Sequence, residues 1–180
     1  ILVLWGSLST MTDVTHLCHF DIPLISNIPN IIYLAPTNKE EYLAMLDWSI
    51  NYKQHPVVIR VPVGPITTAT KPVPTDYSQL NKYEVVEQGK DVAIIALGNF
   101  FQLGKQVHNL LKNQGINATL INPRYITGID KQLLDTLCLD HKLVVTLEDG
   151  VLDGGFGEKI ARYYGTKNMK TLCYGAEKQF

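Results

Sequence analysis

The sequence has few cysteines, no long apolar run and almost no net charge, and each shortage excludes a class of protein. Its three cysteines, Cys18, Cys138 and Cys173, are far apart and odd in number, which predicts neither a secreted disulfide framework nor a zinc site. No apolar run reaches the roughly 18 residues that a membrane span needs. The net charge of −1 gives no electrostatic reason to expect nucleic acid or an anionic membrane as a partner. We therefore expect a cytoplasmic protein without a metal site of its own, whose partners are small molecules and other proteins.

The chain has 180 residues, of which 46% are hydrophobic and 18% are charged, so it is large enough to bury a core. It begins with Ile rather than Met, and the apolar stretch from Ile1 to Trp5 has the character of a strand entered partway. We expect the chain to be a piece of a longer protein.

Residues 1–64 show one alternation of strand and helix. The β-branched runs Ile31–Leu34 and Val57–Val61 are typical of strands that are buried on both faces. Between them, apolar residues recur at helical spacing, and Thr37 with Glu40 three positions later predicts a capping box at the start of this helix. Strand, helix and strand in this order indicate a parallel crossover.

Residues 65–82 interrupt the pattern, because three prolines stand there among Thr, Ser and Asp. Such a composition predicts an extended, exposed linker. Residues 83–180 then alternate again between short apolar runs and amphipathic stretches. Strands are expected at Val92–Leu97, Ala118–Ile121, Leu143–Leu147 and Lys170–Tyr174, with helices between them. The fold class is thus α/β, with mostly parallel sheets covered by helices.

Several polar residues have ordinary explanations when they are read alone. His108 and His141 are interpreted as surface residues, and His55 before Pro56 as part of a turn. Glu148 and Asp149 follow a strand, where ligands bind in open α/β sheets, but an exposed acidic turn is the preferred interpretation. The Gly-Gly-Phe-Gly run at 154–157 lacks the spacing of a phosphate loop, so its glycines are expected to permit tight turning and close helix packing.

One string is more specific than these. It contains Thr-His, then Phe-Asp, then Ile-Pro-Asn, at residues Thr15, His16, Phe20, Asp21, Ile28, Pro29 and Asn30. Pro36 and an acidic residue, Glu40 or Glu41, continue it, and 58–64 reads Val-Ile-Arg-Val-Pro-Val-Gly. Later in the chain come Asn122-Pro123-Arg124-Tyr125, and Glu148 followed by the glycine run. This co-linear set resembles the 1-deoxy-D-xylulose-5-phosphate synthase family of transketolase-like enzymes, and the resemblance covers nearly all of the chain.

The resemblance implies that residues 1–64 form the C-terminal part of a pyrimidine-binding domain and residues 83–180 a transketolase C-terminal domain, joined by the linker 65–82. It implies thiamine diphosphate and Mg²⁺ as cofactors, with their ligands upstream of this chain. His16 is then the catalytic residue, which helps to bind substrate and move protons, as an imidazole of near-neutral pKa can do. Thr12 and Asp13 would contribute to substrate binding.

The sequence departs from the family at the positions that hold the substrate phosphate. By the resemblance, two family arginines fall at Trp5 and Val63, and neither Trp nor Val can offer charged, bidentate donors to a phosphate. Arg60 matches a separate family arginine. Three explanations remain open: a homologue with a different or unphosphorylated acceptor, a homologue without carboligase activity, or a basic residue that reaches the site from elsewhere.

The resemblance therefore predicts a transferase that passes a two-carbon unit from pyruvate to an aldehyde, in isoprenoid biosynthesis, with a homodimer as the assembly. The fragment alone is expected to be inactive. The alternatives are a transketolase, a 2-oxo acid dehydrogenase β subunit, or a degenerate homologue that serves as a scaffold or interaction module.

Overall fold

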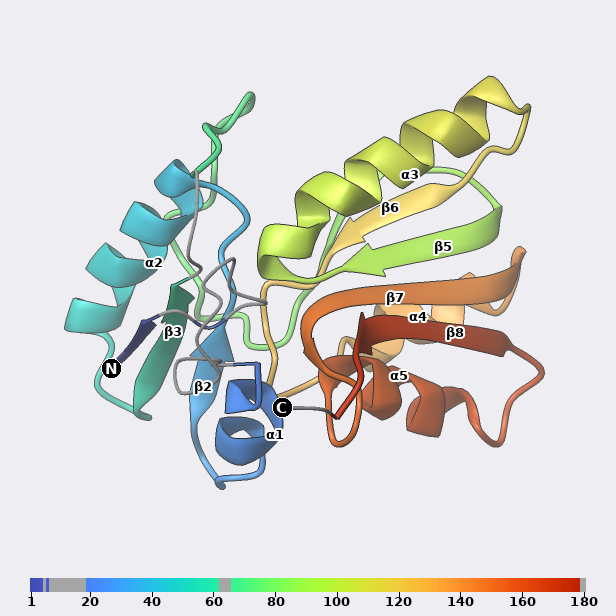
Figure 1. The fold of residues 1–180 in the computed structure, drawn as a ribbon. Coiled ribbons are helices and arrows are strands. Elements are labelled where there is room, and N and C mark those ends of the chain that lie inside the picture. The colour runs from blue at the N-terminus through green and yellow to red at the C-terminus, as the bar shows by residue number, and fades with distance from the viewer. Residues whose placement is uncertain (5, 7–18, 62–65, 179–180) are drawn as a thin grey trace.

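A computed structural model describes residues 1–4, 6, 19–61 and 66–178, and its described strands form two sheets (Figure 1). The smaller sheet has the order β1-β3-β2 and is parallel throughout. The larger sheet has the order β4-β6-β5-β7-β8, in which only the β4–β6 pair is antiparallel. The strand bounds are β1 Leu2–Leu4, β2 Ile32–Leu34, β3 Val57–Val61, β4 Glu84–Glu87, β5 Asp91–Ala96, β6 Thr119–Asn122, β7 His141–Val151 and β8 Lys170–Ala176. The predicted α/β class with mostly parallel sheets is confirmed.

Helices cover both faces of the larger sheet. α3 packs against β5 and β6, while α5 packs against β7 and β8 on the other face (Figure 1). The bounds are α1 Asp21–Ser26, α2 Lys39–Asn51, the short 3₁₀ helix η2 Gly98–Phe100, α3 Phe101–Asn113, α4 Lys131–Leu137 and α5 Phe156–Tyr164. None of the helices in the described ranges has the length and apolar character to cross a membrane.

The start of α2 differs from the prediction by one residue. Asn38, rather than Thr37, is the N-cap, and its side chain accepts a hydrogen bond from the Glu41 backbone N–H. The backbone N–H and the hydroxyl of Thr37 instead donate to the Glu41 carboxylate, each at 2.8 Å. Both Asn and Thr are common N-cap residues. Here the helix begins after Asn38 and not after Thr37, because this start places Glu41 in its buried position at the junction of the two sheets.

Three further interpretations of the sequence were wrong or incomplete. His108 and His141 are buried rather than exposed, because they hold the start of β6: the His108 ring contacts the Ala118 carbonyl and the His141 ring contacts the Thr119 hydroxyl. The motif segment around Asp21 contains the short helix α1, for which no helix was predicted. The edge strand β4 was not predicted either.

The two sheets share one core. Ile22, Tyr33 and Val58 from the first part belong to the same buried cluster as Ile95 and Phe156 from the second. Backbone bonds also cross the boundary: the Ala35 N–H donates to the Arg124 carbonyl, and the Ile126 N–H donates to the Tyr33 carbonyl, both at 2.8 Å. We call this boundary the seam.

Residues 66–83 contain no helix or strand and connect the two parts. The connection is not wholly exposed as predicted, since Tyr77 is buried against Trp48 and its carbonyl accepts a hydrogen bond from the Tyr125 hydroxyl. The division into two domains at 64 and 83 stays a prediction.

Candidate functional site

The carboxyl ends of strands from both sheets meet at the seam. β5 and β6 point toward the smaller sheet in Figure 1, and residues at the ends of β3 and β7 are in direct contact. Ligands in open α/β sheets bind outside the carboxyl ends of strands, so this is where the fold favours a functional site. Two clusters of charged side chains lie there.

The first cluster is centred on Arg60 of β3. Its Nε donates to Asp21 Oδ2 at 2.7 Å and its Nη2 donates to Asp21 Oδ1 at 3.0 Å, which makes a bidentate pair with the first residue of α1. Nη1 donates to the Asp149 carboxylate, and Nη2 also reaches the Asp149 carbonyl at 3.1 Å. The Tyr33 hydroxyl donates to the same Asp21 carboxylate. Arg60 thus ties three elements together: α1, β3 and the end of β7.

All members of the Arg60 cluster are removed from solvent, with Arg60 2% and Asp149 1% exposed. Burial lowers the pKa of Arg60, but the adjacent Asp149 and Asp21 outweigh it, so that its pKa is raised and the guanidinium stays charged. Burial, together with Asp21, raises the pKa of Tyr33, which keeps its hydroxyl a donor. The cluster is therefore a fixed arrangement of charges, in which each donor of Arg60 has a defined direction.

Glu148 and Asp149 are the largest correction to the sequence interpretation. Both lie within β7 and are buried, whereas an exposed acidic turn was expected. Glu148 accepts hydrogen bonds from the backbone N–H groups of Phe156 and Gly157 at the start of α5, at 2.8 and 2.7 Å. Burial raises its pKa to about 7 against these bonds, and burial also raises the pKa of Asp149 against the attraction of Arg60.

The glycine run packs closely around Glu148, as predicted. A Cβ on Gly155 would lie 2.7 Å from the Glu148 carboxylate, and a Cβ on Gly157 would lie 2.5 Å from the Thr146 hydroxyl. Because glycine has no side chain, the first turn of α5 can approach β7 closely. The Glu148 carboxylate then occupies the position that a bound anion has at other helix N-termini.

The second cluster is centred on Glu41 of α2. Arg124 donates from Nε to Glu41 Oε1 at 2.7 Å and from Nη2 to Glu84, and Asn122 Nδ2 donates to Glu41 Oε1 at 3.2 Å. Arg124 has a φ of +58°, a left-handed backbone that is uncommon for arginine. Residues 122–125 thus turn the chain at the end of β6 so that Arg124 reaches across the seam to α2.

The residues predicted to carry the chemistry are outside the part of the chain that the structure describes. These are Trp5, Thr12, Asp13, His16 and Val63. Asp21 and Asn30 of the same motif are described: Asp21 contacts Arg60, and Asn30 lies at a cavity on another side of the seam. The structure therefore brings Asp21 and Arg60 together, and the roles of the five other residues stay predictions.

The contacts among Arg60, Asp21 and Asp149 were not predicted from the sequence. The available signal was their position, because Arg60 and Asp149 both stand near the carboxyl end of a buried strand. That signal does not identify partners, since Arg60 and Asp149 are 89 residues apart in the sequence.

Cofactor ligands cannot be assigned in the described residues. Within the ranges 19–61 and 66–178, no three His, Cys, Asp or Glu side chains gather as a metal site would require. The charged groups at the seam are already paired with one another, and so they do not provide a free set of donors for a diphosphate.

Curated proteins similar to this chain are synthases of 1-deoxy-D-xylulose 5-phosphate. The protein of that name from Clostridium tetani is 33% identical over 168 residues, which are 92% of this chain and 27% of the relative. The one from Clostridium botulinum is 36% identical over 167 residues, which are 91% of this chain and 27% of the relative. The chain thus spans about a quarter of the length of these relatives.

Solved structures show the same fold. A split-gene transketolase, described as an inactive beta4 tetramer, superposes with a TM-score of 0.81 at 22% identity, over 98% of this chain and 57% of that chain. A transketolase mutant from Pichia stipitis gives a TM-score of 0.72 at 15% identity, over 99% of this chain and 25% of that chain. The family model of the transketolase C-terminal domain matches residues 81–175. These residues include the whole β4–α5 segment and nearly all of β8, and the chain therefore belongs to the transketolase C-terminal domain family.

Proposed function

We propose that this chain is the C-terminal part of a thiamine-diphosphate-dependent transferase that passes a two-carbon unit from pyruvate to an aldehyde. The observation that carries the proposal is its similarity to 1-deoxy-D-xylulose-5-phosphate synthases, which extends over about nine tenths of the chain at 33 to 36% identity. Since it covers 91 to 92% of the chain, this similarity extends beyond residues 81–175, which the family domain matches. The proposed context is isoprenoid biosynthesis in the cytoplasm.

In this proposal residues 1–64 complete a pyrimidine-binding domain, and His16 donates to the alkoxide that develops during carboligation. Thiamine diphosphate would supply the carbanion chemistry, and Mg²⁺ would hold its diphosphate, through ligands outside this chain. The Arg60 cluster fixes α1 against β3 and β7 and thereby supports the seam. The fragment would be inactive by itself and would act within a homodimer. The description of one solved neighbour, a split-gene transketolase, as an inactive beta4 tetramer supports the proposed inactivity of the fragment.

The test is a carboligation assay on the full-length protein with pyruvate, thiamine diphosphate and Mg²⁺. We expect turnover in the wild type and a loss of at least about tenfold in His16→Ala, on the scale of proton-transfer contributions. Thiamine diphosphate affinity, measured by calorimetry, should stay within about twofold, which separates a catalytic loss from a folding defect. Unchanged turnover in His16→Ala would reject the role of His16.

The acceptor can be tested in the same assay. Because Trp5 and Val63 stand where the family's phosphate-binding arginines are expected, we propose that the enzyme discriminates weakly between glyceraldehyde and glyceraldehyde 3-phosphate. A strong preference for the phosphorylated acceptor contradicts this specificity. A complete lack of turnover and of cofactor binding would instead favour the degenerate homologue, a scaffold or interaction module, for which the two missing arginines are the supporting observation.

A further inference from the structure

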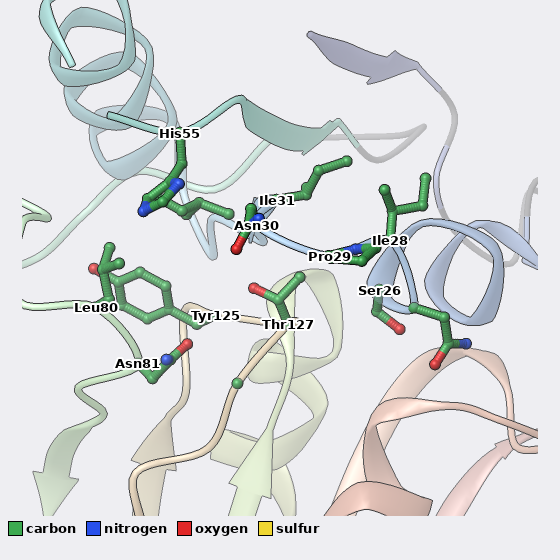
Figure 2. A pocket seen from close by; sticks show the side chains of 13 residues that line it. Ser26, Ile28, Pro29, Asn30, Ile31, His55, Leu80, Asn81, Tyr125 and Thr127 are labelled. Atoms are coloured by element: carbon green, nitrogen blue, oxygen red, sulfur yellow. The ribbon is translucent and has the colours of Figure 1, made fainter. Parts of the chain in front are cut away.

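A cavity of about 450 Å³ opens on the seam at the amino ends of β2 and β3, away from the two charged clusters. Its walls come from the loop 26–31, His55, residues 80–81 and residues 125–128, so both parts of the chain contribute (Figure 2). This volume is within the range of about 300 to 1,000 Å³ that is typical of small-molecule sites, and such sites are frequent at boundaries between structural units.

Two asparagines face this cavity from opposite walls. Figure 2 shows the amide of Asn30 pointing from the loop before β2, and the amide of Asn81 pointing from the connection that precedes β4. Neither amide has a hydrogen-bond partner among the described residues. Each offers two donors and an acceptor with two lone pairs, so together they can bind adjacent hydroxyl groups.

The backbone fixes the direction of both side chains. Asn30 has a φ of +60° and Asn81 has a φ of +62°, both in the left-handed region, which Asn adopts more readily than most other residues with a side chain. Gly128 adjoins Asn81 so closely that a Cβ at Gly128 would lie 2.2 Å from the Asn81 side chain. The glycine thus leaves the space that Asn81 occupies, and the amide is held at the cavity wall.

The lining also defines the charge of a ligand. It contains no Asp, Glu, Lys or Arg, while Ser26 and Thr127 add hydroxyl groups, and the Ser26 oxygen is buried without a partner in the described structure. Pro29 and Leu80 add apolar surface on the two opposite walls. A sugar ring presents hydroxyl and C–H groups together, whereas a phosphate or carboxylate would find no Lys or Arg in this lining, in which His55 is the basic side chain.

We infer that this cavity binds a neutral, polyhydroxylated ligand of the aldose class. The juxtaposition of two amides that have no partner among the described residues with apolar surface, in a cavity whose lining has no Asp, Glu, Lys or Arg, carries the inference. It goes beyond the proposed function and does not depend on it.

The inference is tested by NMR on the protein with D-xylose as the probe. We expect saturation transfer to D-xylose at millimolar concentration, with amide shift changes at Asn30, Asn81 and Gly128. D-xylose 5-phosphate, which carries a dianion, should bind at least about fivefold more weakly. Binding of the phosphate as strongly as the neutral sugar, or shifts confined to other parts of the chain, would overturn the inference.

Variants make the test specific. Asn30→Gly and Asn81→Gly remove the amides but suit the left-handed backbone, so the fold should persist. Each should weaken D-xylose binding at least threefold, and Asn117→Gly, an exposed position outside the cavity, should leave it unchanged. Equal binding by the two cavity variants and the control would show that the amides do not form a site.

Discussion

At the scale of single residues, Arg60 is the position where the fold depends most on one side chain. It places one positive charge against the carboxylates of Asp21 and Asp149, all three buried. A buried pair adds little over apolar packing, but the removal of one partner leaves uncompensated charge in a low-dielectric interior. The cluster is thus sensitive to loss of the arginine in particular.

Arg60→Met should lower the free energy of unfolding by roughly 3–5 kcal/mol, as measured by urea denaturation. Arg162→Met, at an exposed position of α5, is the matched control and should change it by less than about 0.5 kcal/mol. The triple variant with Asp21→Asn and Asp149→Asn should recover part of the loss, because no charge is then left unpaired. If Arg60→Met unfolds like the control, the cluster does not stabilise the seam.

Glu148 makes stability depend on pH. Burial raises its pKa from 4.5 to about 7, so the folded protein binds this proton more tightly than the unfolded chain. The contribution of Glu148 is therefore fully present below pH 4.5, declines as the pH rises to about 7 and is constant above that. Over two and a half pH units the decline is at most roughly 3 to 4 kcal/mol.

Glu148→Gln, which does not titrate, isolates this dependence. As the pH rises from 5 to 7, the free energy of unfolding of the wild type should fall relative to that of Glu148→Gln. Above pH 7 the difference between the two proteins should stay constant. Urea denaturation at a series of pH values measures it. A difference that stays flat between pH 5 and 7 would mean that Glu148 is ionised throughout this range in the folded protein.

At the scale of elements, the contact of α5 with β7 and β8 depends on the absence of a side chain at position 157. A Cβ there would meet the Thr146 hydroxyl at 2.5 Å and Cys173 at 3.1 Å, and both belong to the sheet. α5 cannot move away without losing the hydrogen bonds from its first turn to Glu148. The close packing of α5 on the sheet and the burial of Glu148 therefore depend on each other.

Gly157→Ala should destabilise the protein by about 1–3 kcal/mol through overpacking, as measured by thermal or urea unfolding. Gly165→Ala, at the other end of α5, is the control: its Cβ would have no contact nearer than 3.4 Å, and φ there is −58°. The control should be neutral or slightly stabilising. A Gly157→Ala variant as stable as the control would show that α5 can shift without cost.

At the scale of the whole molecule, the shared core and the two charged clusters predict that both sheets unfold together. Both tryptophans, Trp5 and Trp48, lie in the first part of the chain, so their fluorescence reports on that part alone. Fluorescence and far-ultraviolet circular dichroism should therefore give coincident urea transitions in the wild type.

Arg124→Asn should separate the two transitions, with fluorescence changing first, because it removes the cross-seam pair with Glu41 while Asn tolerates the left-handed backbone. Lys142→Met removes an exposed pair with Asp91 and should leave the transitions coincident. Separate transitions already in the wild type would show that the seam does not couple the sheets.

The sequence by itself determined the local pattern of this protein. Apolar β-branched runs predicted strands such as Val57–Val61 and Val92–Leu97, and the amphipathic stretches between them predicted helices such as α3. Burial of one or both faces of an element shows directly in the order of its apolar residues. The co-linear motifs also indicated the family to which the chain belongs.

Only the tertiary structure decided which polar groups are buried and with what partners. His108 and Glu148 have the sequence context of surface residues, and their burial follows from the packing of α3 and α5. Arg60 meets Asp149 because two sheets bring their strand ends to one seam, and Asn30 faces Asn81 across another part of it. The sequence around a charged residue or an amide does not indicate which distant residue it will contact. Such sites therefore depend on how the helices and strands pack together.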